Sequence, residues 1–507
     1  MSAKRPNILF LMTDQQRHDA LGCVNPAIRT PALDALAARG VRFSQAVCNV
    51  PMCVPSRYSM MTGLYGFQCG VRHNTQMITR GADMPAPTIA ERLAAAGYQT
   101  AGFGKTHWYI GSRIMPGVPV EGSRRGFEVR AIRGAKEPCN DEAGSLYMAD
   151  EEPEWHSRVS EEQRKGGPGG ESVPGYIGGA SGIPPERHAE GWLTEKALEF
   201  LDRGRDRSRP FFLYLSLDYP HVPLFVPPGF EELYDLEDFP DNPPPDPMPG
   251  GHVAGHRFET IWRAMSPEQR RRSRLRYAAL CSYADSLFGR VLDRLAAAGE
   301  LDNTLAIFTS DHGDMLGDRG RVSKYCLYEG SVRVPLIVAG PGVARRGAVD
   351  GRPAELVDVL PTILQAAGLD IPEELPGISL LSDEVRPGSF AEMHGRGYEE
   401  YQRAPAIMYR TAEWKLILHL PGRLGEAVPS ADRISGELYR LSDDPLELRN
   451  LYDEGEWRDV RERLTAQALM HIMCAAGRFP RAPARARIRL TGPETKPDRS
   501  LWEEQGL

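Results

Sequence analysis

Long apolar runs are absent from this chain of 507 residues. The apolar stretch nearest the start covers only residues 7–12, which is too short for the core of a signal peptide. No other run approaches the roughly 20 apolar residues that a membrane-spanning helix needs. We therefore expect a protein with neither a secretion signal nor a membrane span.

Cysteine is scarce as well, and its spacing indicates no disulfide framework. The 8 cysteines are residues 23, 48, 53, 69, 139, 281, 326 and 474. Without paired spacing, a reduced and cytoplasmic setting is the expectation.

Long runs of one charge sign are also lacking. The net charge is −7 and the signs are interspersed, which argues against a polyanion-binding protein. One arginine-rich stretch contains Arg270, Arg271, Arg272, Arg274 and Arg276. We expect these side chains to form a solvated helix face and not a nucleic-acid site.

What the chain does have is an alternation of apolar segments and helical patterns. Strands are expected at residues 7–12, 98–104, 210–218 and 305–310, and helices at 31–39, 88–96, 191–201 and 274–298. Because the two kinds alternate, the sequence predicts an α/β fold with a large, mostly parallel sheet between helices.

A change of pattern near residue 385 indicates a second domain. Short alternating segments at 406–410, 414–418 and 437–441 precede a helix expected at 457–476. We predict a large domain over residues 1–385 and a smaller subdomain with an antiparallel sheet over residues 386–507. The tail rich in Arg and Pro is expected to wrap a neighbouring subunit of a homo-oligomer.

Two stretches are poor in periodicity and rich in Gly, Pro and charge, at residues 108–190 and 240–256. Long irregular segments in compact domains commonly serve as lids or binding loops. We expect loops here, with those of residues 108–190 selecting the substrate.

Polar residues follow two of the predicted strands directly. Asp14 and Gln15 end the first, and Asp311 and His312 follow the strand at 305–310. Sites in open α/β sheets are built at such strand ends, and three oxygen ligands with one imidazole can hold a divalent cation. For Asp14 alone, a helix N-cap is the alternative.

The segment Cys53-Val54-Pro55-Ser56-Arg57 is unusual for a core. An unmodified Cys53 would be a candidate nucleophile, with Arg57 one helical turn away to lower its pKa. The alternative is a buried cysteine at the start of a helix. In either case the helix N-terminus would offer N–H groups to an oxyanion.

With Thr62-Gly63 after it, this segment resembles the signature of the type I sulfatases, of the alkaline-phosphatase-like superfamily. The resemblance implies that the formylglycine-generating enzyme oxidises Cys53 to formylglycine (3-oxoalanine). The hydrated aldehyde, activated by a divalent cation, would attack a sulfate monoester and form a covalent sulfo-enzyme. Its second hydroxyl would then expel sulfate.

Other segments extend the resemblance over nearly the whole chain: Lys105-x-His107, Pro220-His221, Lys324 before Glu329-Gly330-Ser331-Val332-Arg333, and Glu437-Leu438-Tyr439. By resemblance, sulfuryl oxygens would be held by Lys105, Lys324 and Asn74. The alternatives are a surface Lys–His pair, a surface lysine and a turn asparagine.

The remaining roles implied by the resemblance concern the two chemical steps. Arg57 would orient the nucleophile and Asp311 would take its proton. His221, with Lys324, would ease departure of the alcohol, and His107 would promote sulfate release. A structural histidine is the alternative for His221.

The predicted ligands of the cation depart from the common family pattern. They are Asp14, Gln15, the group derived from Cys53, Asp311 and His312. Calcium is the first expectation, and the nitrogen ligand makes manganese the second. Gln15 and His312 also resemble phosphonate monoester hydrolases and choline sulfatase. Hydrolysis of phosphonate monoesters or phosphodiesters is therefore one alternative, and an inactive, anion-binding protein is another.

Overall fold

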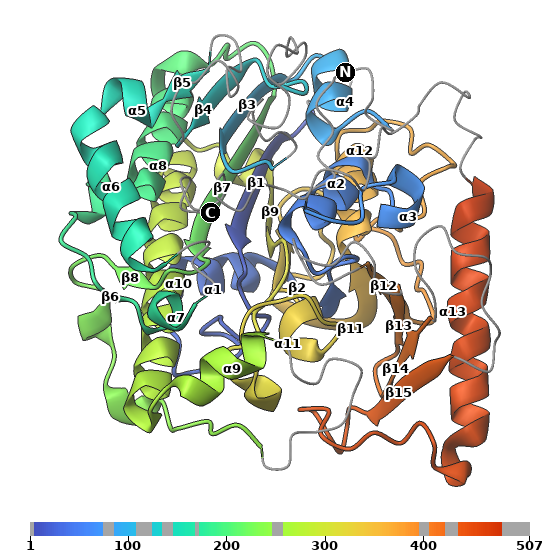
Figure 1. Ribbon diagram of the computed structural model, residues 1–507. Coiled ribbons are helices and arrows are strands. Elements are labelled where there is room, and N and C mark those ends of the chain that lie inside the picture. The colour runs from blue at the N-terminus through green and yellow to red at the C-terminus, as the bar shows by residue number, and fades with distance from the viewer. Residues whose placement is uncertain are drawn as a thin grey trace, which may run out of the picture.

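A nine-stranded sheet forms the centre of the molecule (Figure 1). The computed structural model describes residues 5–74, 86–107, 124–133, 145–167, 172–245, 257–394, 405–420 and 434–478. Within them the strand order is β11-β2-β10-β9-β1-β7-β3-β4-β5. These strands are β1 (Asn7–Asp14), β2 (Gly40–Val47), β3 (Gln99–Gly104), β4 (Val129–Ile132), β5 (Leu146–Tyr147), β7 (Phe211–Pro220), β9 (Thr304–Ser310), β10 (Leu336–Ala339) and β11 (Ala348–Glu355).

The sheet is mostly parallel, as the sequence predicts. Strand β1 pairs in parallel with β7 and β9, whereas β10 runs antiparallel to both of its neighbours, β2 and β9. Every residue of β1 is buried. A strand covered on both faces is apolar throughout, which explains why residues 7–12 show no polar alternation.

Helices cover both faces of the sheet (Figure 1). One face carries α1 (Pro31–Arg39), α8 (Ala189–Glu199) and α10 (Pro267–Ala297), and both α1 and α8 pack on α10. The other carries α2 (Cys53–Thr62), α4 (Ile89–Ala95) and α12 (Val359–Ala366). In the described part of the chain, no helix is long and apolar enough to cross a membrane.

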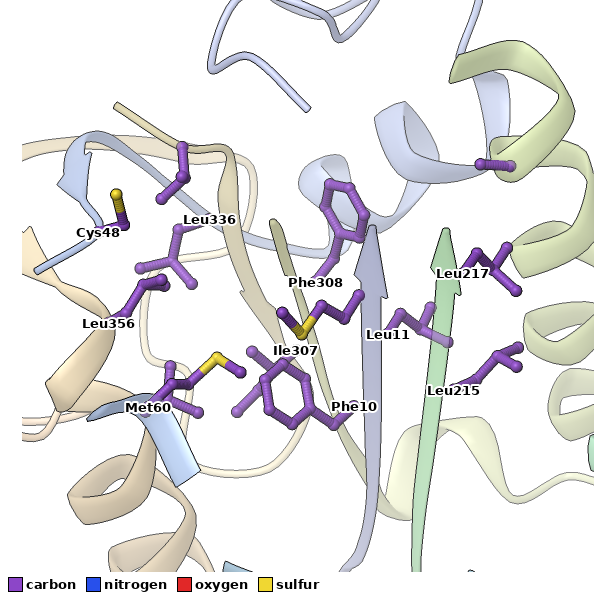
Figure 2. Close-up of a cluster of buried hydrophobic side chains, with 14 of the residues drawn as sticks. Phe10, Leu11, Cys48, Met60, Leu215, Leu217, Ile307, Phe308, Leu336 and Leu356 are labelled. Atoms are coloured by element: carbon purple, nitrogen blue, oxygen red, sulfur yellow. The ribbon is translucent and has the colours of Figure 1, made fainter. Parts of the chain in front are cut away.

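The core lies between these helices and the sheet. Figure 2 shows Met60 of α2 beside Phe10 and Ile307, while Leu11 and Leu215 point away from them. These side chains are at most 1% exposed. Because successive strand residues alternate between faces, the two apolar faces bind helices on opposite sides.

A smaller antiparallel sheet follows, in agreement with the predicted C-terminal subdomain. Its strands are β12 (Ser389–Met393), β13 (Ala406–Arg410), β14 (Trp414–His419) and β15 (Ser435–Arg440). Helix α13 (Arg458–Arg478) packs along it (Figure 1). The domain boundary at residue 385 stays a prediction, and the tail after residue 478 lies outside the described residues.

The prediction of loops throughout residues 108–190 is wrong for much of the described part. It contains β4 and β5 of the main sheet. It also contains α5 (Met148–Glu151), α6 (Pro153–Lys165), α7 (Val173–Ile177), a 3₁₀ helix at Pro185–Arg187 and β6 (Gly179–Ala180), which pairs with β8 (Phe225–Val226). Pairing with neighbouring strands forms β4 and β5, although their own sequence has little periodicity. Three further α-helices of the described chain are short: α3 (Gly66–Cys69), α9 (Arg257–Ala264) and α11 (Glu329–Val332).

The arginine-rich stretch is helical but is not a solvated face, so that expectation is wrong. Helix α10 starts at Pro267, seven residues before the predicted start. The Arg270 guanidinium is buried and pairs with Asp241 at 2.7 Å. Arg271 donates to the carbonyls of Leu236 and Phe239. These side chains therefore fasten the segment before residue 245 to the helix.

The register brings several strand ends to one edge of the sheet. Thr13 pairs with Ser310, and Gly104 pairs with Ser216. The residues just beyond these positions in β1, β3, β7 and β9 therefore meet at the carboxyl edge.

A buried ionic cluster joins the two sheets. Glu329 of α11 pairs with Arg410 at 2.8 Å and with Lys415 at 2.7 Å, and both of these residues belong to the smaller sheet. Lys415 also pairs with Glu447 at 2.7 Å. Burial alone would raise the pKa of Glu329, but the charges of Arg410 and Lys415 hold it well below its ordinary range.

Replacing Glu329 by Gln is expected to destabilise the protein by about 3–5 kcal/mol, because the buried Arg410 loses its carboxylate and Lys415 keeps only Glu447. The matched change Glu413→Gln, in an exposed pair with Arg440, should cost only about 0–1 kcal/mol. Denaturant unfolding measures the free energy of unfolding of both variants.

The stabilisation by Glu329 is present above the ordinary glutamate pKa of about 4.3 and is lost as pH falls through its lower folded pKa. Equal costs for the two variants at pH 7 would contradict this role.

Candidate active site

Four buried side chains from three elements converge at the carboxyl edge. Asp14 ends β1, Cys53 begins α2, and Asp311 and His312 follow β9. Cys53 Sγ lies 3.1 Å from His312 Nε2 and 3.8 Å from Asp14 Oδ1. His312 Nε2 is 3.7 Å from a carboxylate oxygen of each aspartate. Asp14 and His312 lie almost 300 positions apart in the sequence, and the sheet brings them together.

His312 presents a ring nitrogen to the other three residues. Its Nδ1 lies 2.9 Å from the carbonyl oxygen of Gly313, which can only accept a hydrogen bond. We therefore assign the proton to Nδ1 and a lone pair to Nε2. Burial lowers the pKa of His312, which favours this neutral form.

Arg57 joins the two aspartates. Its Nε donates to Asp311 at 2.8 Å and its Nη2 to Asp14 at 3.0 Å, and none of the three side chains is exposed. Nη1 donates to the carbonyl of Lys105 at 2.6 Å and to Ser216 Oγ at 2.9 Å. The guanidinium therefore fixes the ends of four strands relative to one another.

The expectation that Arg57 lowers the pKa of Cys53 is wrong. Burial, followed by the charge of Asp14, raises the pKa of the Cys53 thiol to about 12. Arg57 is committed to the two carboxylates, and its charge is balanced by theirs. An unmodified Cys53 is therefore a poor nucleophile near neutral pH.

Lys105 and His107 lie just beyond β3. Lys105 Nζ contacts Asp14 Oδ2 at 2.8 Å. The segment is not extended as assumed from the sequence, because His107 has a φ of 55°. Burial, and then the charge of Lys105, lowers the pKa of His107 well below its ordinary range. Its Nδ1 is buried and makes no hydrogen bond within the described residues, so a neutral imidazole stands beside the site.

Lys324, His221 and Gln15 form a second group beside the first. Lys324 Nζ lies 2.8 Å from His221 Nε2 and 2.7 Å from Gln15 Oε1. His221 Nδ1 is 2.6 Å from the carbonyl of Val222, which places its proton there. The Lys324 ammonium therefore donates to an unprotonated His221 Nε2.

Gln15, predicted as a cation ligand, has its side chain engaged elsewhere. Its amide oxygen accepts from Lys324, and its nitrogen donates to Asp314 at 2.5 Å and to Tyr176 at 3.3 Å. One lone pair of the amide oxygen is thus used by Lys324, and the role of Gln15 as a cation ligand stays a prediction.

Asn74 lies at the start of helix α2. Its side-chain oxygen accepts from the backbone N–H of Val54 at 3.1 Å. The side chain is 2% exposed. The structure thus brings Asn74 to the N-terminus that carries Cys53, where helix N–H groups favour negative charge.

Sequence reasoning missed three residues that border the site. Asp314 accepts from Gln15 and from Tyr176, the latter at 2.7 Å. Asp218 of β7 lies 3.7 Å from Lys105 Nζ. Asp314 and Asp218 follow or end predicted strands, so their positions carried a signal. Tyr176 lies in the stretch taken for loops and carried none.

The donor set fits a divalent cation. One ligand atom each from Asp14, Cys53, Asp311 and His312 lies within 4.8 Å of all the others. Ligands about 2.0–2.6 Å from one ion lie about 3–5 Å apart, and the contacts of His312 and Cys53 at 3.1–3.8 Å fall in this range. Nδ1–H bonding to a carbonyl also orients ligating histidines in known metal sites. Asp14, Asp311 and His312 would hold the ion, with the group at position 53.

The surroundings of this set are suited to an anionic ligand. Lys105, Lys324 and the helix N-terminus lie near Cys53, within a buried site where charge is weakly screened. Preorganised cations of this kind stabilise negative charge that develops in a transition state. The arrangement can therefore perform group transfer from an anionic, tetrahedral centre to a residue at position 53.

Two family models match the chain. The "Sulfatase" model matches residues 6–369, and the model "N-sulphoglucosamine sulphohydrolase, C-terminal" matches residues 317–473. The first covers well over half of the chain.

Characterised relatives and solved structures agree. The chain is 28% identical to an arylsulfatase of Clostridium perfringens, over 90% of this chain and 92% of that protein. It is 31% identical to a choline-sulfatase of Rhizobium meliloti, over 92% of this chain and 86% of that protein. The structure resembles a phosphonate monoester hydrolase of Agrobacterium radiobacter, with a TM-score of 0.72 and 22% sequence identity. The match covers 93% of this chain and 96% of that one, and it concerns the fold alone. The chain thus belongs to the sulfatase family, the type I sulfatases of the alkaline-phosphatase-like superfamily, and is a sulfuric ester hydrolase.

Proposed function

We propose that this protein hydrolyses sulfate monoesters through a formylglycine made from Cys53, with the help of a divalent cation. The observation that carries the proposal is the buried convergence of Cys53, Asp14, Asp311 and His312, with Arg57 and Lys105 on the two carboxylates. The raised pKa of the thiol supports it further, because an unmodified Cys53 would be a poor nucleophile.

In the first step, one hydroxyl of the hydrated aldehyde attacks sulfur and the alcohol leaves. Asp311 takes the proton of the nucleophile, and Arg57 keeps the hydrate oriented. The leaving oxygen takes one proton from the Lys324 ammonium, which its hydrogen bond to the neutral His221 Nε2 holds in place. Lys105 and Asn74 bind the sulfuryl oxygens.

In the second step, the neutral His107 takes the proton of the other hydroxyl. The carbon–oxygen bond to the sulfate then breaks, and the aldehyde forms again. A divalent cation, when bound, supplies positive charge next to the nucleophile. We propose calcium, with manganese as the alternative that the nitrogen ligand favours. The formylglycine-generating enzyme, a cytoplasmic location and a homo-oligomer remain predictions.

The maturation of Cys53 is tested by mass spectrometry. In protein produced with the formylglycine-generating enzyme, the peptide with Cys53 should lose its sulfur and gain an aldehyde. Cys53→Ala should lower the turnover of nitrophenyl sulfate by at least about 10³-fold, because the nucleophile is gone. The exposed Cys23 provides the control, since Cys23→Ser should leave activity unchanged. An intact thiol at position 53 in active protein would refute the proposal.

The cation is tested by its removal. A chelator should abolish activity and lower the melting temperature, and calcium or manganese should restore both. Saturation at about 100 times Kd stabilises a folded protein by about 2.7 kcal/mol. Asp311→Asn should lose the cation-dependent shift in melting temperature, whereas the exposed Asp238→Asn should retain it. If a chelator changed neither the activity nor the melting temperature, a bound cation would be contradicted.

Sulfate and phosphonate substrates separate the two candidate activities. We expect kcat/KM to be larger for nitrophenyl sulfate than for nitrophenyl phenylphosphonate, because the family and the named relatives are sulfatases. The reverse ratio would favour the phosphonate monoester hydrolase alternative.

A further inference from the structure

Asp218 lies beside Lys105 and is held there by other residues. Its Oδ2 pairs with Arg133 Nη1 at 2.9 Å, and Arg133 Nη2 donates to Gln163 at 2.8 Å. The backbone carbonyl of Asp218 accepts from the N–H of His221 at 3.0 Å. Arg133, which follows β4 and is itself held by Gln163 of α6, therefore fixes one carboxylate oxygen of this residue.

The other carboxylate oxygen of Asp218 is poised for Lys105. Oδ1 lies 3.7 Å from Lys105 Nζ, is buried, and accepts no hydrogen bond within the described part of the chain. Burial alone would raise the pKa of Asp218, but the charges of Lys105 and Arg133 lower it. An ionised oxygen without a hydrogen bond attracts the nearby ammonium by charge.

Lys105 therefore lies between two carboxylates. Asp14 Oδ2 is nearer, at 2.8 Å, but it also receives Arg57 at 3.0 Å. Were Asp14 the only partner, the ammonium would be drawn toward the nucleophile's own ligands. The second carboxylate, on the side of β7 and His221, provides an opposing attraction.

We propose that Asp218 is a positioning residue, which draws the Lys105 ammonium from Asp14 toward the sulfuryl oxygens of the bound ester. The proposal rests on the proposed function, in which Lys105 binds those oxygens. Asp218 acts on the reaction only through Lys105, and Arg133 serves to hold Asp218.

A double-mutant cycle tests this coupling on nitrophenyl sulfate. Asp218→Asn should lower kcat by about 10-fold with little change in KM, which is less than the roughly 10²–10³-fold loss expected for removing an electrostatic donor itself. In the background of Lys105→Gln, the same change should cost less than about 2-fold, because no ammonium remains to be positioned. Asp218→Glu should recover part of the loss. If Asp218→Asn lowered kcat by the same factor with and without Lys105, the proposal would be overturned.

Two controls separate positioning from a structural role. Asp238→Asn makes the same charge change at an exposed site and should leave kcat unchanged. In the background of Arg133→Gln, Asp218→Asn should still lower kcat. If its effect disappeared there but persisted with Lys105→Gln, Asp218 would serve only to neutralise Arg133.

Inorganic sulfate separates this inference from the proposed function. Sulfate should raise the melting temperature of the unmatured protein, and Asp218→Asn should reduce that shift only while Lys105 is present. This pattern would support the positioning role even if the matured protein turned over no sulfate ester. A sulfate shift that Asp218→Asn left unchanged would overturn it, and the absence of both turnover and shift would overturn both proposals.

Discussion

Arg57 lies without exposed surface between the carboxylates of Asp14 and Asp311. Two buried carboxylates near one another are costly, and one planar guanidinium that donates to both offsets their repulsion. The same side chain reaches the backbone after β3 and the side chain of Ser216 in β7. The geometry of the site therefore depends on this one cation, which is supplied by the helix that begins with Cys53.

The C-terminal sheet supports the same site from outside. Lys324 precedes Glu329 by five residues, and Glu329 is bound by Arg410 and Lys415 of the smaller sheet. The segment that carries Lys324 is thus tethered at α11 across the boundary between the two sheets. This connection gives the second sheet a structural part in placing a residue that faces the proposed leaving group.

Much of the fold followed from local pattern, and the exceptions have a common cause. The apolar runs that became β1, β7 and β9 were evident because strands covered on both faces lack polar residues. The sequence did not predict strands β4 and β5 or helices α5, α6 and α7. Pairing and packing with distant residues stabilise these elements more than their own propensity does. The arginines of α10 were misjudged for the same reason, as their partner Asp241 lies outside the helix.

The sequence by itself determined the types of chemical group, their order and their places at strand ends, because these follow from local pattern and from resemblance to a family. It identified Cys53, Arg57, Lys105, His221, Asp311 and Lys324 as candidates. Only the tertiary structure decided which partner each group has: that Arg57 serves the carboxylates and leaves the thiol pKa high, that Gln15 binds Lys324, and that Asp218 stands beside Lys105. Charge interactions and hydrogen bonds depend on distances of a few ångströms in space, and positions along the chain do not specify those distances.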